Sequence, residues 1–256
     1  MPCSDLYSEI AVNIDMFDMY KTIAVLAVCV IPAICIFLWL CRYKDIRPLG
    51  MGMLSFFIFS TVAEWFFTIV FLHGIPFTKA FFTATTVRLV IFGCLCAGIF
   101  EEFGRYYFFN TGLGEYEGRD TAIGYAIGHF SIEIIIMTVV PILMGQTLIV
   151  NQQDVLYCIA ERVTACCGHT ALSSIIWYGI CRNKKAALPA AAFVHAVCDA
   201  PLGMYNYGLI GHLNAEVLFA VFVAIICISA AALWRKLPSG MVCRAEWAEG
   251  YDSQPK

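Results

Sequence analysis

The sequence predicts an all-α fold, a polytopic bundle of about seven transmembrane helices. Hydrophobic residues make up 61% of the chain and charged residues only 14%, and the mean hydropathy is +0.77, far above that of soluble domains. Apolar runs of about 20 residues recur along the chain, and a helix rising about 1.5 Å per residue needs about that many to cross roughly 30 Å of hydrocarbon. We therefore expect an integral, multi-pass protein of the plasma membrane.

Each expected span is an apolar run bounded by charged or turn-forming residues. The first contains no charge and stops at Arg42, and the second follows the Arg47-Pro48 pair. The sixth is the least regular, although Pro189 suits a first helical turn and Pro201 lies near its end. In chain order the runs cover residues 22–41, 51–72, 80–103, 121–145, 155–181, 187–205 and 210–234.

Basic residues indicate the orientation, because lysine and arginine resist translocation. They collect in alternate connections, at residues 42–47, 105–119 and 182–185 and after residue 234. We expect the N-terminus outside and the C-terminus in the cytoplasm. Residues 1–236 are predicted to form a single transmembrane domain with its core motifs at 85–200, and residues 237–256 a polar cytoplasmic tail.

Other features of the composition exclude some partners and sites. A formal net charge of −3 argues against a nucleic-acid partner. The 13 cysteines include no CxxC pair and lie mostly within spans, where a thiol packs as a small hydrophobe. The lipid bilayer is the partner that the composition requires.

Ionisable residues inside the spans need a partner or a function, because each costs roughly 2.5–3.5 kcal/mol at a helix centre. Four of them lie toward the expected outer side: Glu64, Arg88, Glu161 and Arg162. We expect this outer group to form ion pairs, including one between Glu64 and Arg88, that hold the helices together.

A second set lies toward the expected inner side, on four different spans. His129 and His195 are each about eight residues, or roughly 12 Å, from the predicted inner ends of their helices, and His169 is slightly deeper. Glu101 and Glu102 lie near the inner end of the third span. The set therefore reaches overlapping depths from separate helices.

Spacing within the helices strengthens this prediction, because residues four apart share a helix face. The sequence contains three such pairs: His129 with Glu133, His195 with Asp199, and Glu101 with Arg105. The two members of each pair could simply satisfy each other's charge and hydrogen bonds. However, small and apolar residues would stabilise the helix bundle better than such pairs do. We expect a functional cluster.

Such a cluster suits hydrolysis by either of two routes. A carboxylate beside a histidine can draw a proton from water, while a second histidine donates to a developing oxyanion. His129, His169, His195 and Glu102 could instead hold Zn²⁺, which lowers the pKa of bound water. Two other functions stay open. One is a non-catalytic scaffold. The other is a proton-coupled transporter, which is disfavoured because the sequence shows no inverted repeat.

Four motifs on successive spans carry a resemblance to a known group: "EEFGR" from Glu101, "GHFSIE" from Gly128, "ERVTACCGH" from Glu161 and "HAVCD" from His195. Together they resemble the YhfC-type membrane peptidases, a branch of the CAAX-protease and bacteriocin-processing superfamily. The superfamily also includes a non-catalytic subunit of gamma-secretase. This chain departs from the family's "GHGG" pattern at Phe130 and Ser131, which suggests a tighter pocket.

The resemblance implies an endopeptidase for membrane-proximal or lipidated peptides, with a chamber open to the cytosol. It assigns water activation to Glu101 or Glu102 with His129, and oxyanion stabilisation to His195 with Asp199. The same motifs supply the supporting residues Arg105, Glu133, Glu161, Arg162 and His169.

Overall fold

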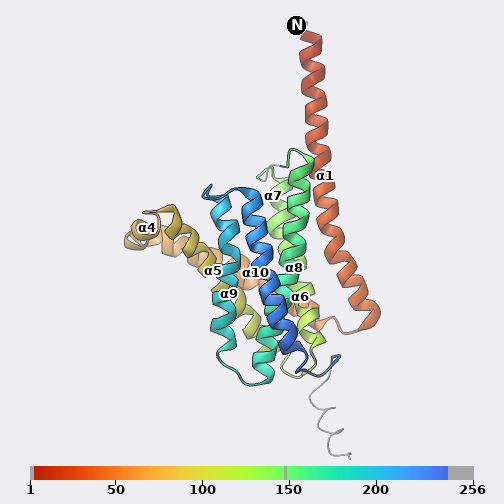
Figure 1. The fold of residues 1–256 in the computed structure, drawn as a ribbon, viewed down its shortest axis with the longest axis vertical. Helices are drawn as coiled ribbons and strands as arrows, with labels where there is room; N and C mark the ends of the chain where they lie inside the picture. Colours follow the sequence, from red (N-terminus) through yellow and green to blue (C-terminus); the bar gives the residue numbers. More distant parts are fainter. Residues whose placement is uncertain (1–2, 147–148, 242–256) are drawn as a thin grey trace, which may run out of the picture.

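The computed structural model describes residues 3–146 and 149–241, and this part of the chain is helical with no strand, which confirms the all-α class. Figure 1 shows near-vertical helices packed side by side, with α1 running beyond the rest of the bundle at its N-terminal end. The elements are α1 (Cys3–Arg42), α2 (Arg47–Ser55), η1 (Phe56–Ala63), α3 (Glu64–Ile69), η2 (Val70–Gly74), α4 (Pro76–Phe82), α5 (Thr86–Gly112), α6 (Asp120–Glu133), η3 (Ile134–Val139), α7 (Val140–Leu143), α8 (Gln152–Cys181), α9 (Ala187–Asn206) and α10 (His212–Trp234).

Five helices among the described residues are long and apolar enough to cross a membrane, or six if α4 and α5 count as one broken span. The two are bent by 112°, where the sequence predicts a continuous helix. The 30-residue α8 is not among the five. It packs against α1, α5, α6, α9 and α10, so neighbouring helices rather than lipid surround its polar residues.

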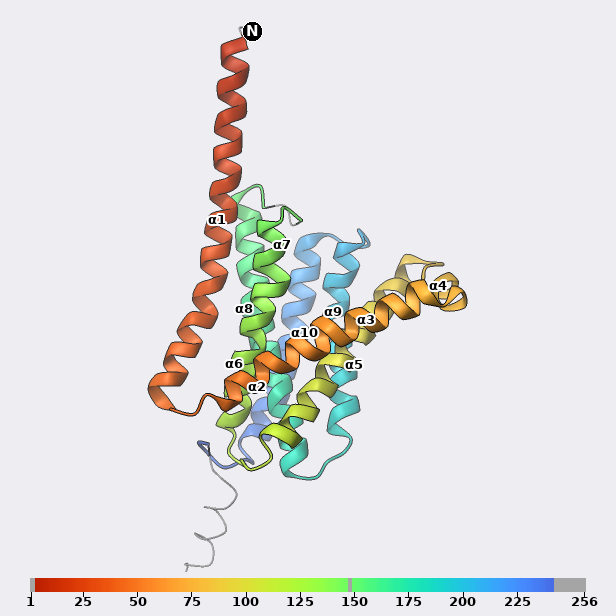
Figure 2. The same ribbon diagram turned by 180° about the vertical axis from the view of Figure 1, so that it is seen from behind.

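Residues 47–74 form one long helix that crosses the others at a steep tilt (Figure 2). It contains two π-helical stretches, η1 and η2, and a third, η3, follows α6 directly after Glu133. A π-helical turn inserts an extra residue and rotates the side chains that follow, and such turns often lie at functional sites. Two of them, η1 and η3, flank the polar centre of this bundle.

Aromatic side chains fill the bundle near the end where α8 stops and α6 begins. Phe109, Tyr125 and Trp177 are fully buried, with the Phe109 ring centroid 4.4 Å from that of Tyr125 and 5.0 Å from that of Trp177. The Trp177 indole N–H donates to the Gly118 carbonyl at 3.0 Å, which satisfies its polar atom. This aromatic plug closes the bundle on that side.

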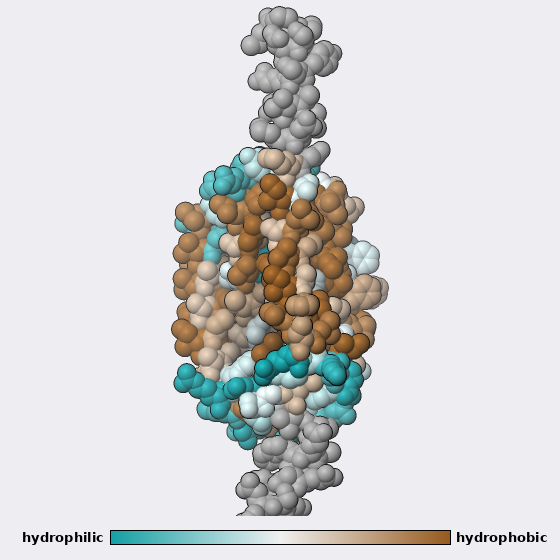
Figure 3. Space-filling view, turned by 90° about the vertical axis from the view of Figure 1, so that its right-hand side faces the viewer, coloured by the Kyte–Doolittle hydropathy of each residue, from teal (hydrophilic) through white to brown (hydrophobic). Residues whose placement is uncertain are grey.

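The surface has the division expected of a membrane protein. Figure 3 shows apolar residues over the middle of the molecule and a collar of hydrophilic residues at one end. Exposed basic residues gather at that end, which we call the basic end: Arg42, Lys44, Arg182, Lys184, Lys185, Arg235 and Lys236. The positive-inside rule predicts that the basic end faces the cytoplasm; the location in the plasma membrane likewise stays a prediction.

The chain after α10 folds back onto the bundle. Leu237 is buried, and the Pro238 and Gly240 carbonyls accept hydrogen bonds from the backbone N–H groups of Arg119 and Asp120 at 2.9 and 3.2 Å. The first five residues of the expected polar tail are thus packed. Residues 242–256 lie outside the described residues.

Two glycines let α2 approach α6 closely. A Cβ on Gly52 would lie 2.7 Å from the His129 backbone nitrogen, and one on Gly128 would lie 2.7 Å from the Leu49 carbonyl carbon. Real Cβ atoms do not approach backbone so closely, so a methyl group at either position must push the helices apart. His129, which follows Gly128 directly, takes its position from this contact.

We therefore expect Gly52→Ala to lower the free energy of unfolding by about 1–3 kcal/mol, as overpacking does in a close-packed interior. Gly50→Ala in the same helix is the matched control, because its Cβ would meet nothing within 4 Å. Alanine also favours helix over glycine, so the control should be neutral or slightly stabilising. Denaturant titration of the two variants in the same micelles measures the difference, and equal stabilities would contradict the close contact.

Candidate metal centre

Four helices deliver buried ionisable side chains to one point in the bundle. Glu101 and Glu102 come from α5, His129 from α6, His169 from α8 and His195 from α9. All five side chains are buried, and Glu102 and His129 have no exposed surface. The expectation that separate helices contribute to one cluster is met.

The Glu101 carboxylate lies at the middle of the three imidazoles. Its Oε2 atom is 3.0 Å from His129 Nε2, 3.8 Å from His169 Nδ1 and 3.9 Å from His195 Nε2. The ring centroids of His129 and His169 are 4.9 Å apart, and those of His169 and His195 are 5.7 Å apart. One nitrogen of each ring therefore faces the same carboxylate oxygen.

Carboxylates hold the opposite nitrogens of two of these rings. His169 Nε2 lies 2.7 Å from Glu133 Oε2, and His195 Nδ1 lies 2.9 Å from Glu102 Oε1. A carboxylate only accepts, so the His195 nitrogen in its hydrogen bond with Glu102 carries the proton, whereas His169 and Glu133 form an ion-pair contact. Metal-binding histidines are oriented in this way.

His195 also faces a second acceptor. Its Nε2 atom is 3.4 Å from Asp199 Oδ2, the i+4 pair expected from the sequence. His195 therefore has a hydrogen bond to Glu102 at Nδ1 and an ion-pair contact with Asp199 at Nε2. Asp199 is about a third exposed, so this side of the ring borders solvent.

Arg105 is fully buried and forms an ion pair with one of the two adjacent glutamates. Its Nη1 pairs with Glu102, whereas its Nη2 lies 3.1 Å from His169 Nδ1 and 3.4 Å from His129 Nε2. We expected Glu101 to be the partner of Arg105, four residues away on the same face, but the ion pair forms with Glu102, three residues away. Glu101 therefore faces the three imidazoles and does not pair with Arg105.

The donor set fits a transition metal such as zinc. One ligand atom from each of Glu101, His129 and His169 lies within 4.8 Å of the others, and all three residues are buried. Two imidazoles and a carboxylate are the donors that catalytic zinc sites commonly use. The geometry places Glu101 in this group, where the sequence suggested Glu102.

The hydrogen bonding of His129 is also compatible with a bound cation. Its Nε2 atom would have to donate to Glu101 and accept from Arg105, yet a ring nitrogen can do only one of these. Its Nδ1 atom is buried without a hydrogen-bond partner among the described residues. A cation bound by Nε2 and by the Glu101 oxygen would remove this conflict.

The remaining predicted residues extend the network away from the basic end. Arg162 Nη1 donates to Glu133 Oε1 at 3.1 Å, and its Nη2 pairs with Glu161. All ten residues that the sequence predicted for the site are therefore joined by short contacts. The expected pair of Glu64 and Arg88 does not form: Arg88 lies over the Phe81 ring and donates to the Phe81 carbonyl at 3.3 Å.

Three cavities that share wall residues lie beside the cluster. A small cavity of about 80 Å³ touches Glu101, His169 and His195, and it shares Glu101 and Asp199 with a larger one of about 670 Å³. The larger cavity shares Arg162 and Asn206 with a third, of about 750 Å³, at the loops before α8 and before α10.

The chamber therefore opens away from the basic end. The aromatic plug of Phe109, Tyr125 and Trp177 fills the basic end, and the opening to the cytosol that the resemblance implies stays a prediction. If the basic end faces the cytoplasm, water enters from the opposite side of the membrane.

Comparison with known proteins agrees with this geometry. The sequence model of a family described as YhfC intramembrane metalloprotease matches residues 26–155, just over half of the chain. This chain belongs to that family. The match contains the EEFGR and GHFSIE motifs of the YhfC family and hence Glu101, His129 and Glu133, while His169 and His195 lie beyond its end.

A YhfC relative is similar over much of its length. The uncharacterized membrane protein YhfC of Bacillus subtilis (strain 168) is 23% identical over 212 residues, which cover 71% of this chain and 82% of that protein. No solved structure matches this YhfC family member.

The structure adds Phe56 to this YhfC site, a residue that sequence reasoning missed. The Phe56 ring from η1 meets the His129 ring edge-on, with centroids 5.1 Å apart. Glu64, which was expected to pair with Arg88, instead lines the larger cavity. Outside the site, Glu216 near the start of the apolar helix α10 is buried 3.4 Å from His212, which sequence reasoning also missed. Its presence within an apolar span is the signal that could have drawn attention to it.

Proposed function

We propose that this protein is a zinc-dependent intramembrane endopeptidase that cleaves membrane-proximal or lipidated peptides. One observation carries the proposal: three inward-facing imidazole nitrogens surround the Glu101 carboxylate, and carboxylates orient two of the rings from behind. We further propose that the predicted relationship to CAAX-type proteases holds for this chain.

In this proposal Glu101, His129 and His169 hold the metal, which when bound supplies a more acidic water and polarises the peptide carbonyl. Glu133 keeps the proton of His169 on Nε2, so that Nδ1 stays free for ligation. His195, held between Glu102 and Asp199, donates a hydrogen bond to the oxyanion that develops on the substrate carbonyl.

The surrounding helices prepare the site for this chemistry. The plug at the basic end excludes water from one side, which strengthens the electrostatic interactions of the buried groups. The larger cavity, bounded by η1, α3, α5 and α9, leads to Glu101 and would admit both the peptide and the attacking water.

The test is peptide cleavage by the purified protein in proteoliposomes before and after removal of zinc with a chelator. We expect cleavage of a membrane-anchored peptide library to stop on chelation and to return when zinc is added. His129→Ala and His169→Ala should each lose both the bound zinc, measured by elemental mass spectrometry, and the cleavage. His73→Ala is the matched control, because His73 is exposed on η2, outside the cluster.

A second candidate function is a non-catalytic scaffold, and Arg105 favours it. Its guanidinium lies against the same nitrogens of His129 and His169 that a metal would use, so the cluster can satisfy itself without an ion. This alternative predicts no bound zinc and no cleavage in the parent protein. It also predicts that His129→Ala lowers thermal stability, and persistent cleavage after full chelation would instead indicate a metal-free hydrolase.

A further inference from the structure

A second large cavity lies on the opposite side of α6 and α8 from the chamber. It has a volume of about 700 Å³ and is bounded by α1, α6, α8 and α10. Its wall includes Ile127, Phe130 and Ala231, and it contains none of the residues of the candidate metal centre. We call this cavity the lipid-facing groove, because α1 and α10 expose apolar side chains to the bilayer on either side of it.

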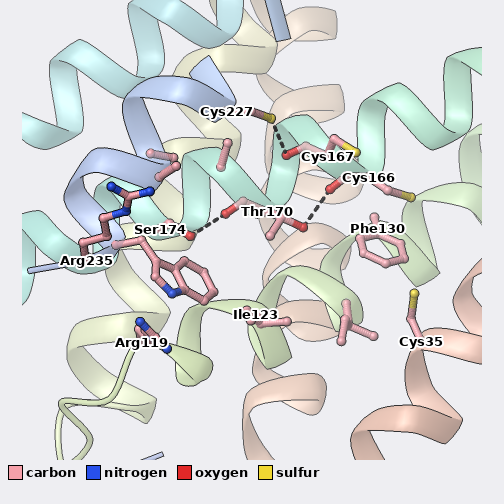
Figure 4. Close-up of a pocket in the computed structure, with 15 residues that line it drawn as sticks. Cys35, Arg119, Ile123, Phe130, Cys166, Cys167, Thr170, Ser174, Cys227 and Arg235 are labelled. Atoms are coloured by element: carbon pink, nitrogen blue, oxygen red, sulfur yellow. Dashed lines mark hydrogen bonds between the residues drawn. The ribbon is translucent and has the colours of Figure 1, made fainter. Parts of the chain in front are cut away.

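The hydroxyl and thiol groups within the groove are satisfied by backbone carbonyls of α8. The Thr170 hydroxyl donates to the Cys166 carbonyl and the Ser174 hydroxyl to the Thr170 carbonyl, both at 2.8 Å, and the Cys227 thiol lies 3.7 Å from the Cys167 carbonyl. These bonds, dashed in Figure 4, leave an apolar wall. Along α10 the groove runs from Cys227 to Arg235, about 12 Å, which is most of the roughly 15 Å depth of one leaflet.

Two arginines close the groove at the basic end. Figure 4 places Arg119 and Arg235 on one side and Phe130 and Cys35 on the other. Arg119 lies 5.5 Å above the Trp234 ring, and its nearest carboxylate, Asp120, is 3.9 Å away, too far for a hydrogen bond. The Arg235 side chain has no polar contact among the described residues.

We infer that the lipid-facing groove binds one anionic glycerophospholipid, with an acyl chain along its apolar wall and the phosphate between Arg119 and Arg235. Charge complementarity selects this occupant. A transmembrane helix or a second copy of this chain could cover the apolar wall, but an apolar surface would leave both guanidinium groups without an anion.

The backbone holds the two arginines at this end of the groove. The segment after α10 is tied to the start of α6 by the hydrogen bonds of Arg119 and Asp120 to Pro238 and Gly240. Arg182 from the end of α8 also donates to the Lys236 carbonyl at 2.6 Å. Bound lipid would thus bridge α6 and α10 on the face opposite the chamber.

The test is native mass spectrometry of the full chain after reconstitution in vesicles of equal phosphatidylglycerol and phosphatidylcholine. We expect one retained lipid per chain, mainly phosphatidylglycerol. Each interfacial arginine should favour the anionic lipid about fivefold, so Arg119→Gln with Arg235→Gln should remove a preference of about 25-fold. The matched control is Lys184→Gln with Lys185→Gln, which removes the same charge from exposed positions outside the groove.

A second variant tests the apolar wall. Ala231 is exposed and lines the groove, so Ala231→Trp should fill it without disturbing the fold and should reduce retention of both lipids. An unchanged thermal midpoint confirms that this variant is folded. The inference is overturned if the arginine and lysine variants lose the preference equally, or if lipid retention survives Ala231→Trp.

Discussion

Glu101→Gln is expected to abolish peptide hydrolysis while the bundle stays folded. Glu101 Oε2 is the one carboxylate oxygen within 4 Å of all three imidazoles, and it lies where a metal and the attacking water must meet. The amide keeps the size of the side chain but loses the negative charge with which Glu101 would hold the metal. We expect the loss in kcat/KM to exceed the roughly 10–100-fold that removal of a residue behind a metal ligand costs.

The role of Glu101 can be separated from that of its neighbour. Glu102 is committed to Arg105 and His195, so Glu102→Gln should mainly lower stability. The control for charge is Glu115→Gln, an exposed acid paired with Arg47 outside the cluster. Cleavage that survives Glu101→Gln but not Glu102→Gln would reverse the two assignments, and zinc content would tell whether Glu101 is itself a ligand.

Arg105→Met is expected to cause the largest loss of stability. The arginine and its partner Glu102 have side chains with no exposed surface, so methionine would leave a carboxylate buried without its cation. Removing one partner of a buried ion pair costs about 3–5 kcal/mol. Denaturant titration in micelles should show this loss, and adding Glu102→Gln should recover part of it, because the uncompensated charge is then gone.

The control for this experiment is Arg88→Met on the same helix, α5. Arg88 is exposed and rests on the Phe81 ring, an arrangement worth about 0.5–1 kcal/mol. If Arg105→Met cost no more than Arg88→Met, the buried pair would not stabilise the fold as argued. A cost that Glu102→Gln fails to relieve would show that packing rather than charge is lost.

Depth along the helices predicted much of the site, but only one of the three pairs expected from i,i+4 spacing forms, because Arg105 pairs with Glu102 and His129 contacts Glu101. The i,i+4 pair of His195 and Asp199 forms, and His129, His169 and His195 meet because each lies at a similar depth on a different helix. Depth follows from counting residues along a helix, so it needs no knowledge of packing. The same counting could not show that His129 turns to Glu101 and His169 to Glu133, since both partners lie on other helices.

Contacts that depend on helix rotation were predicted less well. Glu64 and Arg88 lie at matching depths but do not meet, because α4 bends by 112° from α5 and Arg88, in the first turn of α5, turns to Phe81 near the end of α4. The resemblance likewise gave no indication that the basic end of the bundle is filled. Phe109, Tyr125 and Trp177 are far apart in sequence, and nothing in their spacing indicates that they form a plug.

The sequence by itself determined that this is a helical, multi-pass membrane protein with ionisable groups at one depth, because hydropathy and helical rise act along a single chain. Only the tertiary structure decided which of the two adjacent glutamates lies among all three imidazoles and which forms the ion pair with Arg105. Neighbouring residues on a helix point about 100° apart. Which of them faces a given neighbour depends on how each helix is rotated in the bundle, and that rotation is set by packing against all the others.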